Sequence, residues 1–353
     1  RFTKHGLTAK ITTASSHAET LAEVHVPTTL ITEDMIRNCG GQNLQEVLAA
    51  YVPGMNIVDC NDDINIALRG IYSNGQEKIL IMLNGHRMNS YCTNIASPDF
   101  SISLAKIKQI EVLRGPASSL YGGVALTGVV NIITQQGADI DGVEAKVGIG
   151  NYGQMRGDLV FGKRYFDLDL LVWGSIYKNN GEKKDVSEES FNEDTSNMQQ
   201  DHFTIGRIGN KPSHDIGIQL KWKDLQFFYD AQFSQIIAPF TISTLAKTYD
   251  WDRYKTFNGH SPSYSTESHH VDLSYSRQFE KLYLKGNIAY DNSDLSHYQV
   301  ISDNSFEELG QLMGLDANDP NNIFIYPGLF RNISGQEQNY RFRLQGDHSY
   351  LSS

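Results

Sequence analysis

The sequence predicts a strand-rich membrane protein in which a compact mixed α/β unit precedes about eight antiparallel strands of a β-barrel. Three observations lead to this fold class. The second half of the chain alternates apolar and polar residues with a period of two, and its connections alternate between short and long. No apolar run approaches the roughly 18 residues that a membrane-spanning helix needs, so strands would have to make any membrane crossing.

The composition excludes several classes of function. The 353 residues contain 30 Lys and Arg against 41 Asp and Glu, which gives a formal net charge of −11. No nucleic-acid partner is expected, because binding to phosphates needs a basic face. Cys39, Cys60 and Cys92 are too few for a disulfide scaffold and lack the spacing of metal ligands. We therefore expect neither a metal site nor a cofactor, and the redox state of the three cysteines stays open.

Residues 21–137 are predicted to form the α/β unit, after an N-terminal extension at residues 1–20. Thr32 precedes two acids and begins a short helix, and Asn43 begins a second helix with a capping-box pattern. Asn84-Gly85 predicts a tight turn between two strands. Short apolar runs predict five strands, at residues 55–58, 64–68, 79–83, 107–113 and 129–134.

Residues 142–353 are predicted to supply the N-terminal strands of the barrel, because apolar and polar side chains alternate there. We expect strands at about residues 143–150, 154–162, 166–178, 216–222, 225–235, 267–279, 282–290 and 340–347. The alternation also predicts the faces. The residues expected to face lipid are Ile218, Leu220, Leu284, Ile288, Phe342 and Leu344, and those expected to face inward are Lys285, Asn287, Arg341 and Arg343.

The connections favour a membrane barrel over a soluble β-sandwich, which would not usually place every long connection at one end. Very short turns lie near residues 163–165, 224 and 280–281, and long polar segments lie at about residues 179–213, 236–266 and 291–337. Aromatic residues typical of an interfacial girdle occur near the short turns: Tyr165, Phe166, Trp222, Phe279 and Tyr350.

A series of short motifs runs through the first half of the chain. The motifs are Val26–Ile36, Asn43–Leu48, Val52–Gly54, Ile66–Gly70, Ile81–Arg87, Ile110–Ala117, Ser119–Gly122 and Gly128–Thr134. In this order and spacing they resemble the plug domain of TonB-dependent outer-membrane receptors. The resemblance implies a mixed α/β plug inside the lumen of a barrel of about 22 strands. Eight strands cannot surround such a plug, so we expect the remaining strands to come from another segment of the same protein.

The resemblance also implies a function. We expect a receptor in the outer membrane of a Gram-negative bacterium for energised uptake of a scarce nutrient, most simply a ferric siderophore or a similar small complex. The implied partners are a TonB-type energy-transducing protein of the inner membrane, the small-molecule ligand, and outer-membrane lipid and lipopolysaccharide. The alternatives are a passive surface-binding barrel, or uptake of cobalamin, haem, glycan or peptide. A soluble β-rich adhesin or enzyme is a third class, but no GxSxG, HExxH or P-loop motif occurs, so no catalytic residues are expected.

Residues that follow two of the plug strands are candidates for ligand contact. Aromatic and amide side chains can stack on a small molecule and form hydrogen bonds with it. By the resemblance, these loops face the external cavity. The candidates are Tyr72, Ser73, Asn74, Arg87, Asn89, Tyr91 and Asn94. Ordinary polar loop chemistry is the alternative interpretation.

Arg69 and Arg114 are candidates for a latch between plug and barrel, because each precedes a glycine at the end of an apolar strand. A guanidinium can pair with a carboxylate through two hydrogen bonds, and Glu111 could satisfy a neighbouring Arg. The resemblance implies that such pairs hold the plug in place, and a static ion pair is the alternative. The acids expected to face the lumen are Asp167, Asp169, Asp230 and Asp272.

His269 and His270 are adjacent on a predicted strand. Successive side chains of a strand point to opposite faces, so these two residues are not expected to bind one metal ion together.

Overall fold

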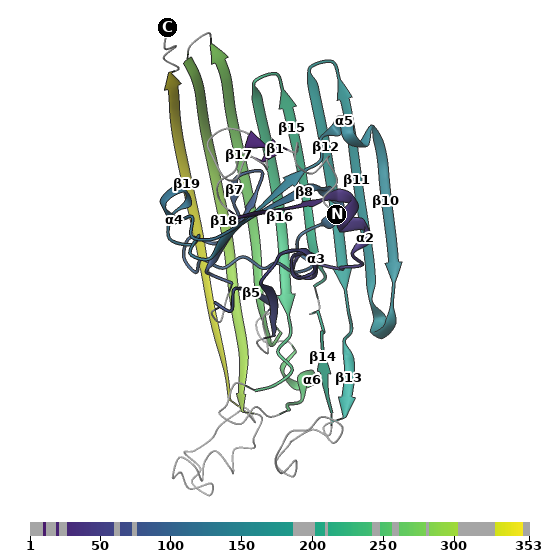
Figure 1. Ribbon diagram of the computed structural model, residues 1–353. Helices are drawn as coiled ribbons and strands as arrows, with labels where there is room; N and C mark the ends of the chain where they lie inside the picture. Colours follow the sequence, from purple (N-terminus) through teal and green to yellow (C-terminus); the bar gives the residue numbers. More distant parts are fainter. Residues whose placement is uncertain are drawn as a thin grey trace, which may run out of the picture.

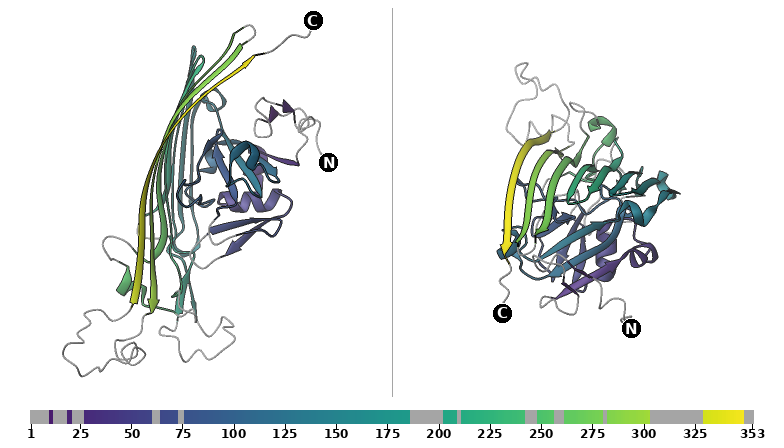
Figure 2. Two further views of the ribbon diagram at one scale, coloured as in Figure 1. Left: turned by 90° about the vertical axis from the view of Figure 1, so that its left-hand side faces the viewer. Right: turned by 90° about the horizontal axis from the view of Figure 1, so that it is seen from above.

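The computed structural model describes residues 10–11, 19–20, 27–59, 64–72, 76–185, 202–208, 211–241, 248–255, 261–279, 282–302 and 329–348. Most of these residues form two units. Residues 142–348 contribute a tall, curved sheet, which we call the wall. The described residues between 27 and 140 form a smaller α/β unit, the plug, which packs against one face of the wall (Figures 1 and 2).

Eight antiparallel strands form the wall, in the order in which they occur in the chain. They are β10 (Gly142–Ile149), β11 (Met155–Tyr165), β12 (Leu168–Lys178), β15 (Ser213–Trp222), β16 (Leu225–Ile236), β17 (Ser263–Phe279), β18 (Leu282–Ser302) and β19 (Leu329–His348). Among the described strands this sheet is open, with β10 and β19 at its edges. The predicted fold class, part of a barrel with about eight strands in this chain, is confirmed.

Three strands are longer than the alternation predicts. β17 begins at Ser263, β18 continues to Ser302 and β19 begins at Leu329, all within segments that the sequence predicts to be loops. These ends extend beyond the apolar belt, where apolar side chains no longer occupy every second position, so the period-two pattern stops while backbone pairing continues. For the same reason the sequence does not reveal the hairpin of β13 (Glu182–Asp185) and β14 (His202–Ile205). Tyr298 and Val300, in this end of β18, are buried in a separate apolar cluster.

Side-chain burial alternates along the wall as predicted. Ile288, Phe342 and Leu344 are 57%, 74% and 65% exposed on the outer face, whereas Asp215 and Asp230 on the inner face are completely buried. The remaining residues of both predicted sets share the expected faces through the strand register: Ile218, Leu220 and Leu284 outside, and Lys285, Asn287, Arg341 and Arg343 inside.

The outer face carries an apolar belt. On β18 its outward side chains run from Leu282 to Tyr290, a length of strand that can cross a bilayer. Four of the predicted girdle aromatics are exposed at the short-turn end of the wall: Tyr165, Phe166, Trp222 and Phe279. Tyr350 lies outside the described residues. None of the helices in the described ranges is both long and apolar enough to span a membrane.

The plug contains a five-stranded sheet in the order β3 (Thr28–Thr32), β8 (Ile107–Arg114), β9 (Gly128–Thr134), β6 (Ile79–Leu83) and β7 (His86–Arg87). Strands β6 and β9 are parallel and the other pairs are antiparallel. β4 (Met55–Asp59) and β5 (Ile64–Leu68) form a hairpin. The helices are α2 (Glu33–Asn38), α3 (Leu44–Tyr51), α4 (Ser118–Tyr121), α5 (Gly137–Ile140) and the short 3₁₀ helix η1 (Leu104–Lys106).

Helices α2 and α3 begin where the sequence predicts. The Thr32 side chain accepts a hydrogen bond from the backbone N–H of Met35, and the Asn43 side chain accepts one from that of Glu46. The Glu46 carboxylate accepts from the backbone N–H of Gln42, one residue before the cap. Helix α3 ends before Pro53-Gly54, as expected for a residue pair that cannot continue a helix.

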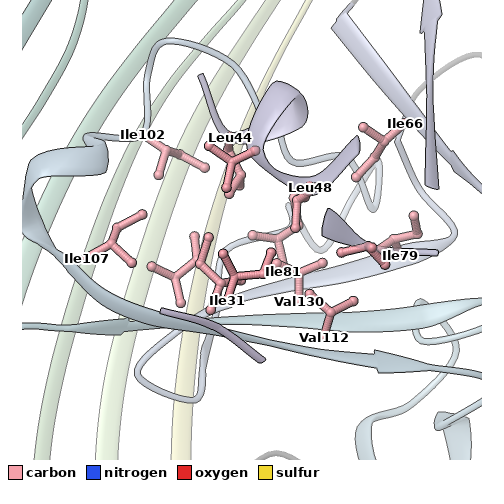
Figure 3. Close-up of a cluster of buried hydrophobic side chains, with 14 of the residues drawn as sticks. Ile31, Leu44, Leu48, Ile66, Ile79, Ile81, Ile102, Ile107, Val112 and Val130 are labelled. Carbon is pink, nitrogen blue, oxygen red and sulfur yellow. The ribbon is translucent and has the colours of Figure 1, made fainter. Parts of the chain in front are cut away.

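The plug has its own hydrophobic core between its helices and its sheet (Figure 3). Its members include Ile31, Leu44, Leu48, Ile81, Val112 and Val130, all completely buried. Phe228 is the one wall residue among the buried members of this cluster in the described ranges. The apolar packing of the plug is therefore largely internal. Smaller apolar contacts join it to the wall, where Ala105 and Ile140 pack on Val160, Leu171 and Trp173 and the Phe100 ring stacks on Tyr177.

We predict that a charge on the outer face destabilises the wall. In Leu284→Arg, a guanidinium would lie within the apolar belt and lower the free energy of unfolding by about 2–4 kcal/mol. Lys285→Leu changes the neighbouring residue on the inner face and is the matched control. The measurement is denaturant unfolding of the protein in lipid vesicles. If Lys285→Leu cost as much as Leu284→Arg, the assignment of the two faces would be wrong.

Candidate functional site

The polar interface between plug and wall is the candidate functional site. Charged side chains of the plug reach the inner face of the wall at buried positions, where an unpaired charge would be costly. Two cation-centred clusters, around Lys106 and His86, carry most of this charge. A third group of contacts fixes the plug loop that contains the predicted ligand residues.

Lys106 forms the first cluster. It is the last residue of η1, and its side chain is completely buried against β15 and β16. Its Nζ atom lies 2.6 Å from Oδ2 of Asp215 and 3.1 Å from Oδ2 of Asp230. Burial alone would lower the pKa of Lys106, but the charges of the two carboxylates outweigh burial and raise it. Lys106 is therefore held as a cation between two wall acids.

Neighbouring donors complete the shell around Asp215. The indole Nε1 of Trp173 donates to Oδ1 at 2.7 Å, and the backbone N–H of Ser103 donates to Oδ2 at 2.7 Å. Trp173 can lie this close to β15 because residue 217 is glycine: a Cβ there would be 2.1 Å from Cζ2 of the indole. The cluster is thus fixed from both the plug and the wall.

His86 forms the second cluster, at the start of β7 immediately after the Asn84-Gly85 turn. Its Nε2 lies 2.6 Å from Oδ1 of Asp291, and its Nδ1 lies 3.1 Å from Oδ2 of Asp272. Burial alone would lower the pKa of His86, but hydrogen bonds with Asp272 and Asp291 and the charge of Asp291 outweigh burial and raise it. The imidazole therefore connects the plug to two adjacent wall strands.

Two further wall residues belong to this cluster. His270 Nδ1 lies 2.8 Å from Oδ1 of Asp291, and Arg341 donates from Nη2 to Oδ2 of Asp291 at 3.0 Å. The same Nη2 lies 3.0 Å from Nε2 of His86, so the guanidinium touches the imidazole. Three neighbouring strands, β17, β18 and β19, thus meet one plug side chain.

Other hydrogen bonds extend the interface in both directions. Ser234 donates from its hydroxyl to the buried carboxylate of Asp99, whose pKa burial raises. Asn84 donates from Nδ2 to the side-chain oxygen of Gln219 at 2.9 Å. The Asp169 carboxylate accepts from the backbone N–H groups of Gly137 and Ala138 at 2.6 and 3.1 Å. Polar contacts therefore reach from β12 to β19.

The predicted lumen acids are largely those that the plug contacts, but their plug partners differ from those expected. Asp169, Asp230 and Asp272 pair with the Gly137–Ala138 backbone, Lys106 and His86, respectively, and Asp167 is exposed. The sequence does not predict that Lys106 and His86 pair with wall acids. Each is a single polar residue beside an apolar strand, and only the docking of the plug places it opposite an acid.

The three predicted latch residues lie away from these clusters. Arg69 is exposed and donates from Nη2 to the carbonyl oxygen of Arg114 at 3.2 Å. Neither arginine pairs with a carboxylate in the part of the chain that the structure describes. Glu111 is buried and accepts from Nε2 of Gln109 at 2.8 Å. Their latch role stays a prediction.

Four of the predicted ligand residues form one turn after β7. Arg87 donates to the carbonyl oxygens of Asn89 and Ser90 and to Oδ1 of Asn94, and its guanidinium lies 4.1 Å from the centre of the Tyr91 ring. Asn89 is buried, and its side chain bonds to the backbone of β6, so it supports the turn from inside. Of the others, Tyr72 is exposed, and Ser73 and Asn74 lie outside the described residues.

The wall holds this turn through Glu337. Its carboxylate accepts hydrogen bonds from the Ser90 hydroxyl at 3.0 Å and from the backbone N–H groups of Tyr91 and Cys92 at 2.9 and 2.6 Å. A cavity of about 80 Å³ lies beside it. Residues lining the cavity include Ser90, Cys92 and Thr93 of the plug and Gln232, Ser293 and Glu337 of the wall. Cys39 and Cys92 are free thiols, and Cys60 lies outside the described residues.

We predict that Lys106→Met strongly destabilises the docked plug. The substitution leaves Asp215 and Asp230 buried without their cation, which costs about 3–5 kcal/mol. Lys108→Met is the matched control, because Lys108 pairs with Asp139 at an exposed site worth at most about 1 kcal/mol. The measurement is denaturant unfolding in detergent. Equal losses in both variants would contradict the role assigned to Lys106.

Comparison with known proteins identifies the plug domain. The model of the TonB-dependent Receptor Plug Domain matches residues 20–129. The chain is 30% identical over 147 residues to the vitamin B12 transporter BtuB of Vibrio vulnificus, covering 41% of this chain and 23% of that protein. It is 31% identical over 132 residues to the iron-regulated outer membrane virulence protein of Vibrio cholerae, covering 36% and 20%. The chain thus spans about a quarter or less of these curated relatives.

Solved structures share the fold. The ferric enterobactin receptor PfeA of Pseudomonas aeruginosa matches with a TM-score of 0.55 at 19% identity, over 91% of this chain and 46% of that one. The ferric-catecholate import receptor Fiu of Escherichia coli K12 matches with a TM-score of 0.57 at 15% identity, over 99% and 50%. The motifs, the plug match and the open wall beside a docked plug agree: residues 20–129 are a TonB-dependent receptor plug domain, and the chain as a whole is similar in fold to receptors of this kind.

Proposed function

We propose that the protein takes up a scarce nutrient across the outer membrane by energised transport, and that it is a transporter and not an enzyme. Its partners would be a TonB-type protein of the inner membrane, the nutrient, and the lipid and lipopolysaccharide around the barrel. One observation carries the proposal: the plug has its own hydrophobic core, and its buried charges are paired across the interface with the wall by ion pairs and hydrogen bonds.

A polar interface suits a plug that moves. When a hydrophobic interface opens, apolar surface is exposed to water at a cost that grows with its area. When the Lys106 and His86 contacts open, water can solvate each separated charge and replace the lost hydrogen bonds. The plug core would stay intact while the polar docking contacts exchange with water, so a pulling partner would have to break these contacts and the smaller apolar ones beside them, but not the core.

A ferric siderophore or a similar small complex is the proposed substrate. The support is the fold shared with several siderophore receptors, at 15–19% identity for the ferric enterobactin and ferric-catecholate receptors. Cobalamin is the second candidate, because the vitamin B12 transporters are 30–32% identical over 147–171 residues. Each of these matches covers less than half of this chain, so the identity separates the two substrates poorly.

We propose that the turn after β7 contacts the ligand. Arg87, Tyr91 and Asn94 would present a cation, an aromatic ring and an amide, with Asn89 holding the turn on β6. Tyr72, Ser73 and Asn74 stay candidates on the neighbouring loop. Haem, glycan or peptide uptake and passive surface binding are the alternatives, and the transport experiment separates passive binding from energised uptake.

We expect transport of a labelled ferric catecholate by cells whose own receptors have been deleted and that produce the complete protein. Accumulation should disappear when the TonB-type protein is also deleted, while binding at the cell surface persists. The same cells offered labelled cyanocobalamin are the control for substrate class. Accumulation that continues without the TonB-type protein would overturn energised transport, and uptake of cyanocobalamin alone would replace the proposed substrate.

The latch role proposed for Arg69, Arg114 and Glu111 makes a separate prediction. If either arginine holds the plug against the barrel, Arg69→Ala or Arg114→Ala should increase the influx of a small antibiotic without abolishing surface binding of the substrate. Lys108→Met, at an exposed ion pair within the plug, is the control. The measurement is the rate of antibiotic influx into intact cells. Unchanged influx in both alanine variants would assign the arginines to the plug surface.

A further inference from the structure

Three potential metal ligands converge where the plug meets the wall. His86 comes from the plug, His270 from β17 and Asp291 from β18, and all three are buried. One ligand atom from each residue lies within 4.8 Å of the other two. Two imidazoles and a carboxylate are a donor set that suits Zn²⁺ and similar first-row divalent ions. We propose that these residues form a zinc-class metal site that joins the plug to the wall.

The distances are close to those that an ion requires. Oδ1 of Asp291 lies 2.6 Å from Nε2 of His86 and 2.8 Å from Nδ1 of His270. Tetrahedral coordination at about 2.0–2.1 Å from the metal separates neighbouring ligand atoms by about 3.3 Å. Oδ1 of Asp291 therefore needs to move away from each of these nitrogens by less than about 1 Å, and the three ligand atoms already lie within 4.8 Å of one another. Water would fill the remaining position.

The surroundings of His86 resemble those of a metal-bound histidine. Its second nitrogen, Nδ1, faces Oδ2 of Asp272 at 3.1 Å. Asp272 is itself held by Asn287, whose Nδ2 donates to both carboxylate oxygens at 2.7 Å. A carboxylate that accepts from the other ring nitrogen fixes the ring and strengthens its metal-binding nitrogen.

His270 uses only one of its ring nitrogens in this structure, Nδ1, which faces Asp291 and is the proposed ligand atom. Its side chain is about 95% buried, and its Nε2 has no partner among the described residues. A purely structural histidine at such a site normally uses both ring nitrogens. Its neighbour His269 points to the outer face and bonds to the hydroxyl of Tyr229. His270 is thus available to a ligand on the plug side, and His269 is not.

Arg341 is the cation that a metal ion would have to displace. Its Nη2 lies 3.0 Å from both Nε2 of His86 and Oδ2 of Asp291. The Arg341 side chain is 31% exposed, and its Nε is buried without a partner in the described structure, so the present position does not satisfy the guanidinium fully. The Tyr91 ring, 5.6 Å away, gives it a second surface on which to pack.

The charges of the cluster also permit a divalent ion. Asp272 and Asp291 carry two negative charges and Arg341 one positive charge, so the cluster with neutral histidines carries a net charge of −1. The neutral state is the one to count, because a metal-bound imidazole is deprotonated at the binding nitrogen. An ion held by residues of both units would act as a cross-link that opposes withdrawal of the plug.

The test uses the complete protein extracted from outer membranes in detergent, with Co²⁺ as a spectroscopic probe and Zn²⁺ as competitor. We expect one Co²⁺ per protein, with the visible absorption of a tetrahedral site, displaced by Zn²⁺. His270→Ala and His86→Gln should abolish this signal, while His269→Ala, the outward-facing neighbour, should retain it. Asp272→Asn should weaken binding about 10- to 100-fold, and Arg341→Gln should tighten it.

Two results would overturn the site. One is the absence of a Co²⁺ signal displaced by Zn²⁺ in the unmodified protein. The other is a signal that survives in His270→Ala but is lost in His269→Ala, which would place the metal on the outer face. Weaker binding by Arg341→Gln would also overturn the assigned position. Because His86→Gln could disturb docking of the plug, circular dichroism and unfolding of each variant are compared first, and His270→Ala, which leaves the plug sequence unchanged, decides the question.

Discussion

The bilayer constrains one face of every wall strand, and the docking of the plug depends on that constraint. Hydrocarbon accepts only apolar side chains, so in an alternating strand the polar side chains must point inward. Asp215, Asp230 and Asp291 therefore lie on the inner face, buried by the plug. A buried carboxylate needs a cation or hydrogen-bond donors, and Lys106 and His86 of the plug help to supply them. The wall thus fixes where the plug must present polar groups.

The two cationic clusters differ in how completely they are satisfied. Lys106 lies between two acids, one of which also accepts from Trp173 and Ser103, so each charge of the cluster has a partner. His86 shares Asp291 with His270 and Arg341. The first cluster suits a fixed anchor, because removing its single cation leaves two buried carboxylates without a positive partner. The second can exchange one cation for another, since Arg341 is partly exposed and can leave.

The predicted ligand turn is in direct contact with the second cluster. Glu337 of β19 binds the backbone of Tyr91 and Cys92, and Arg341 of the same strand packs near the Tyr91 ring while contacting His86. A displacement of the turn would therefore change the surroundings of His86. These adjacent contacts connect the turn to the His86 cluster. The free energy of coupling between the two is a separate quantity that has to be measured.

Local sequence determined the elements of this protein, and docking decided the site. Period-two alternation determined the wall strands and their faces, because burial on one face selects side chains residue by residue. Thr32 and Asn43 determined where helices begin, because capping is local. The ends of β17, β18 and β19 beyond the apolar belt lack this alternation, so backbone pairing set their length. The acids Asp169, Asp230 and Asp272 were predictable from their strand phase. Their partners were not: His86 and Asp291 are 205 residues apart, and only the packing of plug on wall brings their side chains together.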